Sequence, residues 1–117
     1  MHESFKALLP IIIPEGVSEY FEMTHFSKEN QRIDIFLEEI NSIPQEYSSN
    51  KLISKGFFDP VTLQDFPIRG HQVFLHVKRR RWLNQDLAKV VYRNWELVAQ
   101  GTRITNDFAD FLKAISG

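Results

Sequence analysis

The chain has 117 residues, with 14 lysines and arginines, 15 aspartates and glutamates, and no cysteine. This length and a hydrophobic content of 43% are typical of one small globular domain and argue against disorder. The lack of cysteine excludes disulfides, a thiol nucleophile and cysteine-ligated metal centres. The net charge of −1 conceals an acidic part, residues 1–50, with three basic and nine acidic residues, and a basic part, residues 51–117, with eleven and six. This asymmetry favours a nucleic-acid or other acidic partner.

Residues 1–18 predict a helical lead-in. A short helical turn is expected at Ser4–Leu9 and ends at Pro10, and Pro14 can begin a second turn. The most apolar stretch, residues 7–13, is too short to cross a bilayer and follows no basic leader. We therefore expect a cytoplasmic protein without a membrane segment.

Residues 19–100 predict antiparallel hairpins. The first hairpin pairs Tyr20–Ser27 with Arg32–Ile40, because apolar and polar residues alternate along the second of these segments. Turn-forming residues gather in 41–60, and these predict a long loop.

A second set of strands is expected after this loop. Val61–Phe66 is followed by a turn and then by a long strand, Gln72–Trp82, in which alternate residues share a face. A polar turn at Asn84–Lys89 returns the chain through Val90–Val98.

Residues 105–116 predict a C-terminal helix. Thr105 can cap it, and its apolar residues fall at helical spacing. Those residues are Phe108, Phe111, Leu112 and Ile115. Such a stripe most often covers the domain's own sheet, and a partner surface is the alternative. The whole chain, 1–117, is thus predicted to be one α+β domain of small antiparallel hairpins with a short N-terminal helix and a C-terminal helix, without zinc.

The run from Lys78 to Trp82 is the most unusual local feature. Four consecutive cations repel one another, and a phosphate backbone would supply their missing counter-charge. The alternative is a solvated sheet edge whose charge prevents aggregation. Candidate DNA-binding residues are Arg69, Lys78, Arg79, Arg80, Arg81, Lys89, Arg93 and Arg103. Candidate residues for stacking on bases are Trp82, Tyr92 and Trp95.

Other chemistry has little support in the sequence. His71 and His76 fall on opposite faces of the predicted strand and His25 lies on another hairpin, so no metal site is predicted. Asp107 and Asp110 show no sign of burial that would prepare them for acid–base catalysis. The chain has neither a glycine-rich phosphate loop nor a Gly-x-Ser-x-Gly motif. We therefore predict a protein that is not an enzyme and needs no cofactor.

The stretch Asp65–Trp82 runs from an aspartate through a glycine-containing turn and an alternating strand to consecutive arginines. A return strand, the step Arg103-Ile104-Thr105 and the helix at Phe108–Leu112 follow. This order, over about residues 19–117, resembles the zinc-finger-type N-terminal domain of bacterial insertion-sequence transposases. More narrowly, the chain resembles the short N-terminal-region protein of elements whose transposase is divided between two reading frames.

The resemblance implies a non-catalytic region that contacts DNA at the terminal inverted repeats of the element. It also implies a partner, the catalytic transposase part encoded downstream. The alternative is a protein-interaction adaptor that docks the catalytic subunit through its acidic half and terminal helix without binding DNA.

The chain departs from the family where zinc ligands are expected. Trp82-Leu83-Asn84-Gln85 follows the arginines, and Ile43–Lys55, where the earlier ligand pair would fall, contains no cysteine. Apolar packing must then take the place of the metal. The aromatic residues available for it are Trp82, Phe57, Phe58 and Tyr47.

Overall fold

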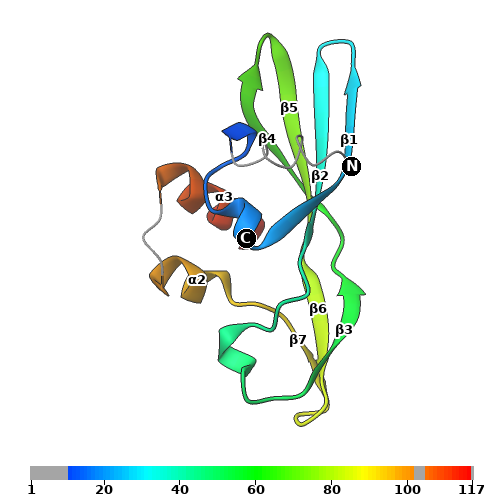
Figure 1. Cartoon of the computed structure of the whole chain (residues 1–117), viewed down its shortest axis with the longest axis vertical. Helices are drawn as coiled ribbons and strands as arrows, with labels where there is room; N and C mark the ends of the chain where they lie inside the picture. The colour runs from blue at the N-terminus through cyan, green and yellow to red at the C-terminus, as the bar shows by residue number, and fades with distance from the viewer. Residues whose placement is uncertain (1–10, 102–104, 117) are drawn as a thin grey trace.

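The chain folds into a four-stranded sheet and a three-stranded sheet that lie end to end, with helices against the four-stranded one (Figure 1). The computed structural model describes residues 11–101 and 105–116. The predicted helical turn at Ser4–Leu9 lies outside these residues. The predicted α+β class is confirmed. Within the described part of the chain, no helix is long and apolar enough to cross a membrane.

The four-stranded sheet, sheet A, consists of two antiparallel hairpins joined side by side. In spatial order its strands are β1 (Phe21–Glu29), β2 (Arg32–Glu39), β5 (His71–Lys78) and β4 (Val61–Ile68). Both predicted antiparallel hairpins are confirmed, and the parallel pairing of β2 with β5 joins them into one sheet. These two strands are parallel because both leave sheet A at the same end and continue toward the second sheet (Figure 1).

The three-stranded sheet, sheet B, is antiparallel and has β6 at its centre. In spatial order its strands are β3 (Leu52–Phe57), β6 (Arg80–Asn84) and β7 (Lys89–Val91). The expected loop at 41–60 is therefore wrong over β3, and a short 3-10 helix, η2 (Gln45–Tyr47), precedes that strand. The segment of β3 shows little apolar alternation, so its sequence alone does not predict a strand. Its pairing with β6 supplies the stability that its sequence lacks.

The long strand expected at Gln72–Trp82 is two strands. β5 ends at Lys78, Arg79 lies between the sheets, and β6 begins at Arg80. The interruption changes which residues point inward: Val77 and its odd-numbered neighbours face the core in β5, whereas Trp82 and its even-numbered neighbours do so in β6. In one continuous strand the alternation would instead place Trp82 on the face opposite to that of Val77.

The main core lies between sheet A and α3 (Asn106–Ser116). The predicted stripe of α3 is buried against apolar residues of β1, β2 and β5, so this helix covers the domain's own sheet. Phe111 contacts the ring of Phe21 edge-on, with 5.6 Å between ring centroids. Gly16 has a φ of 96°, and a Cβ placed there would lie 3.0 Å from the ring of Phe108, so glycine fits the approach of the chain to α3.

The expected return strand at Val90–Val98 ends early. β7 stops at Val91, and α2 (Trp95–Gly101) follows it. Asn94 caps this helix, because its Oδ1 accepts hydrogen bonds from the backbone N–H groups of Glu96 (3.0 Å) and Leu97 (3.4 Å). Trp95 then faces the core and stacks on Phe21.

Thr105→Ala is expected to lower the free energy of unfolding by about 1 kcal/mol. The Thr105 hydroxyl accepts a hydrogen bond from the backbone N–H of Phe108 at 3.2 Å, which leaves one fewer unpaired donor at the start of α3. Urea denaturation measures the change. Ser116→Ala, at the exposed end of the same helix, is the control and should change little; an equal loss in both variants would contradict a capping role for Thr105.

Candidate nucleic-acid interface

The four consecutive cations at 78–81 divide between two environments. Arg80 turns inward, where its backbone N–H donates to Glu39 Oε1 (2.9 Å) and its Nε donates to the Glu39 carbonyl oxygen (3.0 Å). Its guanidinium also donates to the Ser54 hydroxyl. Lys78 places its Nζ 3.9 Å from a carboxylate oxygen of Glu38. These two cations therefore already have partners within the fold.

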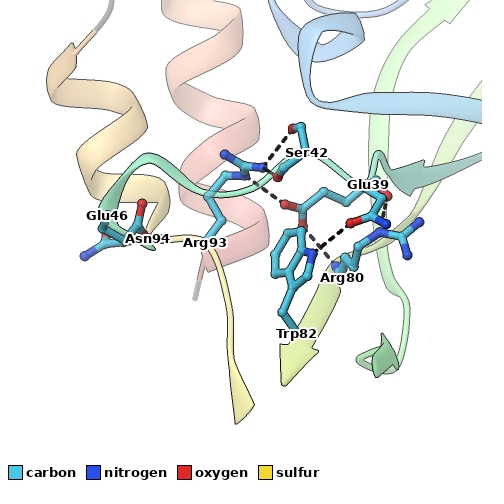
Figure 2. Close-up of polar contacts among 8 residues, drawn as sticks. Glu39, Ser42, Glu46, Arg80, Trp82, Arg93 and Asn94 are labelled. Atoms are coloured by element: carbon cyan, nitrogen blue, oxygen red, sulfur yellow. Dashed lines mark hydrogen bonds and ion pairs between the residues drawn. The ribbon is translucent and has the colours of Figure 1, made fainter. Parts of the chain in front are cut away.

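Arg93 belongs to the same interior network, which Figure 2 shows. Its side chain is 6% exposed, its Nε donates to Glu39 Oε2 at 2.8 Å, and its Nη2 donates to the Ser42 carbonyl oxygen at 2.6 Å. Burial raises the pKa of the Glu39 carboxyl, and the hydrogen bonds from Arg93 and Arg80 oppose that change. The network joins the end of β2 in sheet A to sheet B. Arg80 and Arg93 therefore stabilise the fold, and we do not expect them to contact phosphate.

The two tryptophans are also buried, so the prediction that they stack on bases is wrong. Trp82 is 0% exposed, and its Nε1 donates to Asn41 Oδ1 at 2.9 Å. It packs where the resemblance would place zinc ligands, and it is the residue among the four proposed aromatics that is fully buried. Trp95 packs in the main core against Phe21.

Arg79 and Arg81 lie against one aromatic ring, that of Phe58, instead of against acids. Their guanidinium carbons are 5.2 and 5.7 Å from the centroid of the Phe58 ring, at cation–π distance. Phe58 in turn contacts Tyr92 edge-on, with centroids 5.3 Å apart, and Tyr92 is 59% exposed. We call these four residues, Arg79, Arg81, Phe58 and Tyr92, the arginine–aromatic cluster.

No acid among the described residues neutralises the charge of this cluster. Among the residues that the structure describes, neither Arg79 nor Arg81 forms an ion pair, and the Nε of each has no hydrogen-bond partner. Arg81 makes one long hydrogen bond, from Nη2 to the Lys55 carbonyl oxygen at 3.3 Å. Two guanidinium groups that lie beside the same ring and have no carboxylate partner among the described residues are suited to bind an external anion.

Further exposed cations surround the cluster. Lys89 begins β7, and Lys51 and Lys55 lie at and within β3, the strand that the sequence pattern missed. Asp86, the acid of the β6–β7 turn, already has a partner in the protein, because its Oδ2 accepts a hydrogen bond from the backbone N–H of Lys51 at 2.9 Å. A lysine on each flanking strand extends the positive surface of sheet B.

The remaining predicted phosphate contacts do not join this surface. Arg69 lies in the exposed turn between β4 and β5, at the end of the molecule opposite to sheet B (Figure 1). Arg103 lies outside the described residues. The surface of sheet B therefore retains Arg79, Arg81, Lys89 and Tyr92 from the sequence prediction and adds Phe58, which sequence reasoning had assigned only to packing.

The histidines occupy separate places. His76 Nε2 lies 2.7 Å from Asp34 Oδ1 and its Nδ1 lies 3.1 Å from Thr62 Oγ1, on the face of sheet A away from α3. His71 Nδ1 contacts the Arg69 carbonyl oxygen. The hydrogen bonds from Arg32, and then that from His76, lower the pKa of Asp34. In the described ranges, no group of three histidines or acids is placed to hold a metal ion.

Comparison of the chain with protein-family models, curated proteins and solved structures found no match. What the fold and the site define is an α+β domain with a cationic, aromatic surface on its smaller sheet.

Proposed function

We propose that this chain is the non-catalytic, DNA-binding N-terminal region of an insertion-sequence transposase. Sheet B contacts the phosphate backbone at the terminal inverted repeats, and the catalytic transposase part encoded downstream is the partner. The resemblance of residues 19–117 supports the class. The observation that carries DNA binding is the pair Arg79 and Arg81, held beside Phe58 without an acidic partner among the described residues.

The chemistry of the arginine–aromatic cluster favours a phosphate group, rather than a carboxylate of the protein itself, as the ligand of its two guanidinium groups. A guanidinium that rests on a ring loses little freedom when it binds, and its planar fork matches two phosphate oxygens. Lys55 and Lys89 are exposed on β3 and β7, the two strands beside β6, and add attraction that salt screens. Contacts of this kind position a protein on DNA without reading its sequence.

Two features of the fold argue against the alternatives, which are a charged protective sheet edge and a protein-interaction adaptor. Arg81 lies in β6, the central strand of sheet B, and Arg79 precedes this strand between the two sheets, so neither arginine lies on an edge strand that charge would need to protect. The apolar stripe of α3 is buried within the domain, which leaves an adaptor without the helix surface that it was expected to use. Both observations favour a DNA contact at sheet B.

The salt dependence of DNA binding tests this proposal. With four phosphate contacts, from Arg79, Arg81, Lys55 and Lys89, the slope of log affinity against log salt concentration is expected to be about −3 to −4. The double variant R79Q/R81Q should reduce the magnitude of this slope by about 2. Fluorescence anisotropy on a duplex with the element's end sequence measures both values.

The matched control removes two exposed lysines elsewhere. K28Q/K113Q takes the same charge from β1 and α3, and its slope should stay within about 0.5 of the wild-type value. If the two double variants lose slope equally, the attraction comes from overall charge and sheet B is not the interface. If the wild-type chain binds no DNA, the proposed function is wrong.

A further inference from the structure

A hollow of about 650 Å³ adjoins the arginine–aromatic cluster. Phe58, Arg79, Lys89 and Tyr92 line it on the side of sheet B, and its other wall comes from η2 and α2. Its volume falls within the range of small-molecule sites, which is about 300–1,000 Å³. The surface that we propose for DNA is therefore hollowed beside its cations.

The two walls of the hollow differ in charge. The sheet B wall carries cations, whereas the opposite wall carries Glu46 from η2 and Glu96 from α2. Glu46 is fixed, because its Oε2 accepts the backbone N–H of Asn94 at 2.7 Å. In the part of the chain that the structure describes, the Glu96 carboxylate forms no ion pair. The phosphate backbone of a duplex can meet the cations of the sheet B wall, but the acidic wall repels it.

Aromatic rings complete the lining. Tyr47 contributes from η2, and Phe58 and Tyr92 meet edge-on from the sheet B side. A nucleobase can stack on such rings, and carboxylates accept hydrogen bonds from the exocyclic amino group of adenine or cytosine, which thymine lacks, so that an unpaired thymine offers only its N3–H. The phosphate of the same nucleotide would face Arg79 and Lys89. One ligand thus matches both walls.

We infer that this hollow binds an unpaired nucleotide at a DNA end, with a base that carries an amino group. The inference rests on the proposed function, because it names the form of DNA that the same surface selects. It requires that an end with unpaired nucleotides bind better than a blunt end of the same sequence.

Two duplexes test this inference with the full chain. They share one sequence and differ only in a short single-stranded adenine overhang, and 2-aminopurine in the overhang reports stacking by loss of its fluorescence. The overhang duplex is expected to bind about tenfold more tightly than the blunt one, with quenching, and a thymine overhang should lose most of that gain. Equal affinity for blunt and overhang duplexes would overturn the inference.

Variants separate the hollow from the phosphate surface. Tyr47→Ala, which removes a ring of the hollow that is not part of the arginine–aromatic cluster, should lower affinity for the overhang duplex about tenfold and leave that for the blunt duplex within about twofold. Phe66→Ala is the control, because Phe66 is an exposed ring on β4, outside the hollow. A loss that is equal for both duplexes, or equal in both variants, would contradict the assignment.

A free nucleotide is the other source of this chemistry. Deoxyadenosine monophosphate that displaces the overhang duplex at a similar concentration would identify a free nucleotide as the occupant and overturn the assignment to a DNA end. If blunt DNA binds with the salt dependence described above but overhangs bring no gain, the inference alone fails. If no DNA binds, the proposed function fails with it.

Discussion

Arg93→Met is expected to lower the free energy of unfolding by about 3–5 kcal/mol. The substitution removes the guanidinium that faces Glu39 at 2.8 Å, and the Glu39 side chain is 1% exposed. A buried carboxylate that loses its cation retains most of its desolvation cost, whereas methionine replaces only part of the packing. Arg93 also lies 5.2–5.8 Å from the ring centroids of Tyr20, Trp82 and Trp95, so its stem and plane fill space in the junction.

Urea denaturation, followed by tryptophan fluorescence, measures this loss. Lys89→Met is the matched control, because it makes the same change of residue type at an exposed position of β7 and should stay within about 0.5 kcal/mol of the wild type. The double variant E39L/R93M removes both charges and is expected to regain part of the loss. A loss below about 1 kcal/mol in R93M would show that the connection between sheet A and sheet B does not depend on the pair of Arg93 and Glu39.

Trp82→Ala is expected to cost a similar amount, about 3–5 kcal/mol, because it empties the largest fully buried side-chain position of the domain. Trp82→Phe keeps most of the volume and removes the Nε1 donor to Asn41, which is exposed and can turn to water. The phenylalanine variant should therefore lose less stability than the alanine variant.

DNA affinity distinguishes a packing role for Trp82 from a role in stacking on bases. Trp82→Phe should bind a duplex within about twofold of the wild type, because the indole has no exposed surface on which a base could stack. Anisotropy measures this under conditions in which the variant is fully folded. A clear loss of DNA affinity in a stably folded W82F protein would return Trp82 to the interface.

Elements with a pattern of their own could be predicted from the sequence. In β2 the alternation of Ile33, Ile35 and Leu37 matches their burial, and in α3 a capping threonine precedes a helical stripe. Each pattern is contained within one element, because each element turns a single face to one core.

Elements that depend on distant partners could not be predicted in this way. β3 acquires its form by pairing with β6. The start of α2 is a different case, because the capping residue Asn94 that precedes it was present in the sequence but was assigned to a strand. The break at Arg79 also left a trace: the aliphatic residues of β5, which are buried, fall on odd numbers, whereas the buried Trp82 falls on an even one.

The candidate site shows the same division. The cationic run pointed to Arg79 and Arg81, but the sequence could not separate them from the cations that support the fold. That separation depends on Glu39, which lies 41 residues before Arg80 and 54 before Arg93. Composition and local spacing carry no information on such pairs, so the interior network could be found only from the three-dimensional structure.

The parallel pairing of β2 with β5 also constrains how the domain folds. Each hairpin of sheet A can close from neighbouring residues, but the sheet becomes whole only when Arg32 meets Gln72 and Ile35 meets Leu75. Contacts between segments so far apart in sequence form slowly, because closing the intervening loop costs conformational entropy before the contacts stabilise the sheet. During synthesis, the centre of the sheet must therefore wait until β5 has left the ribosome, and β1–β2 stays an isolated hairpin until then.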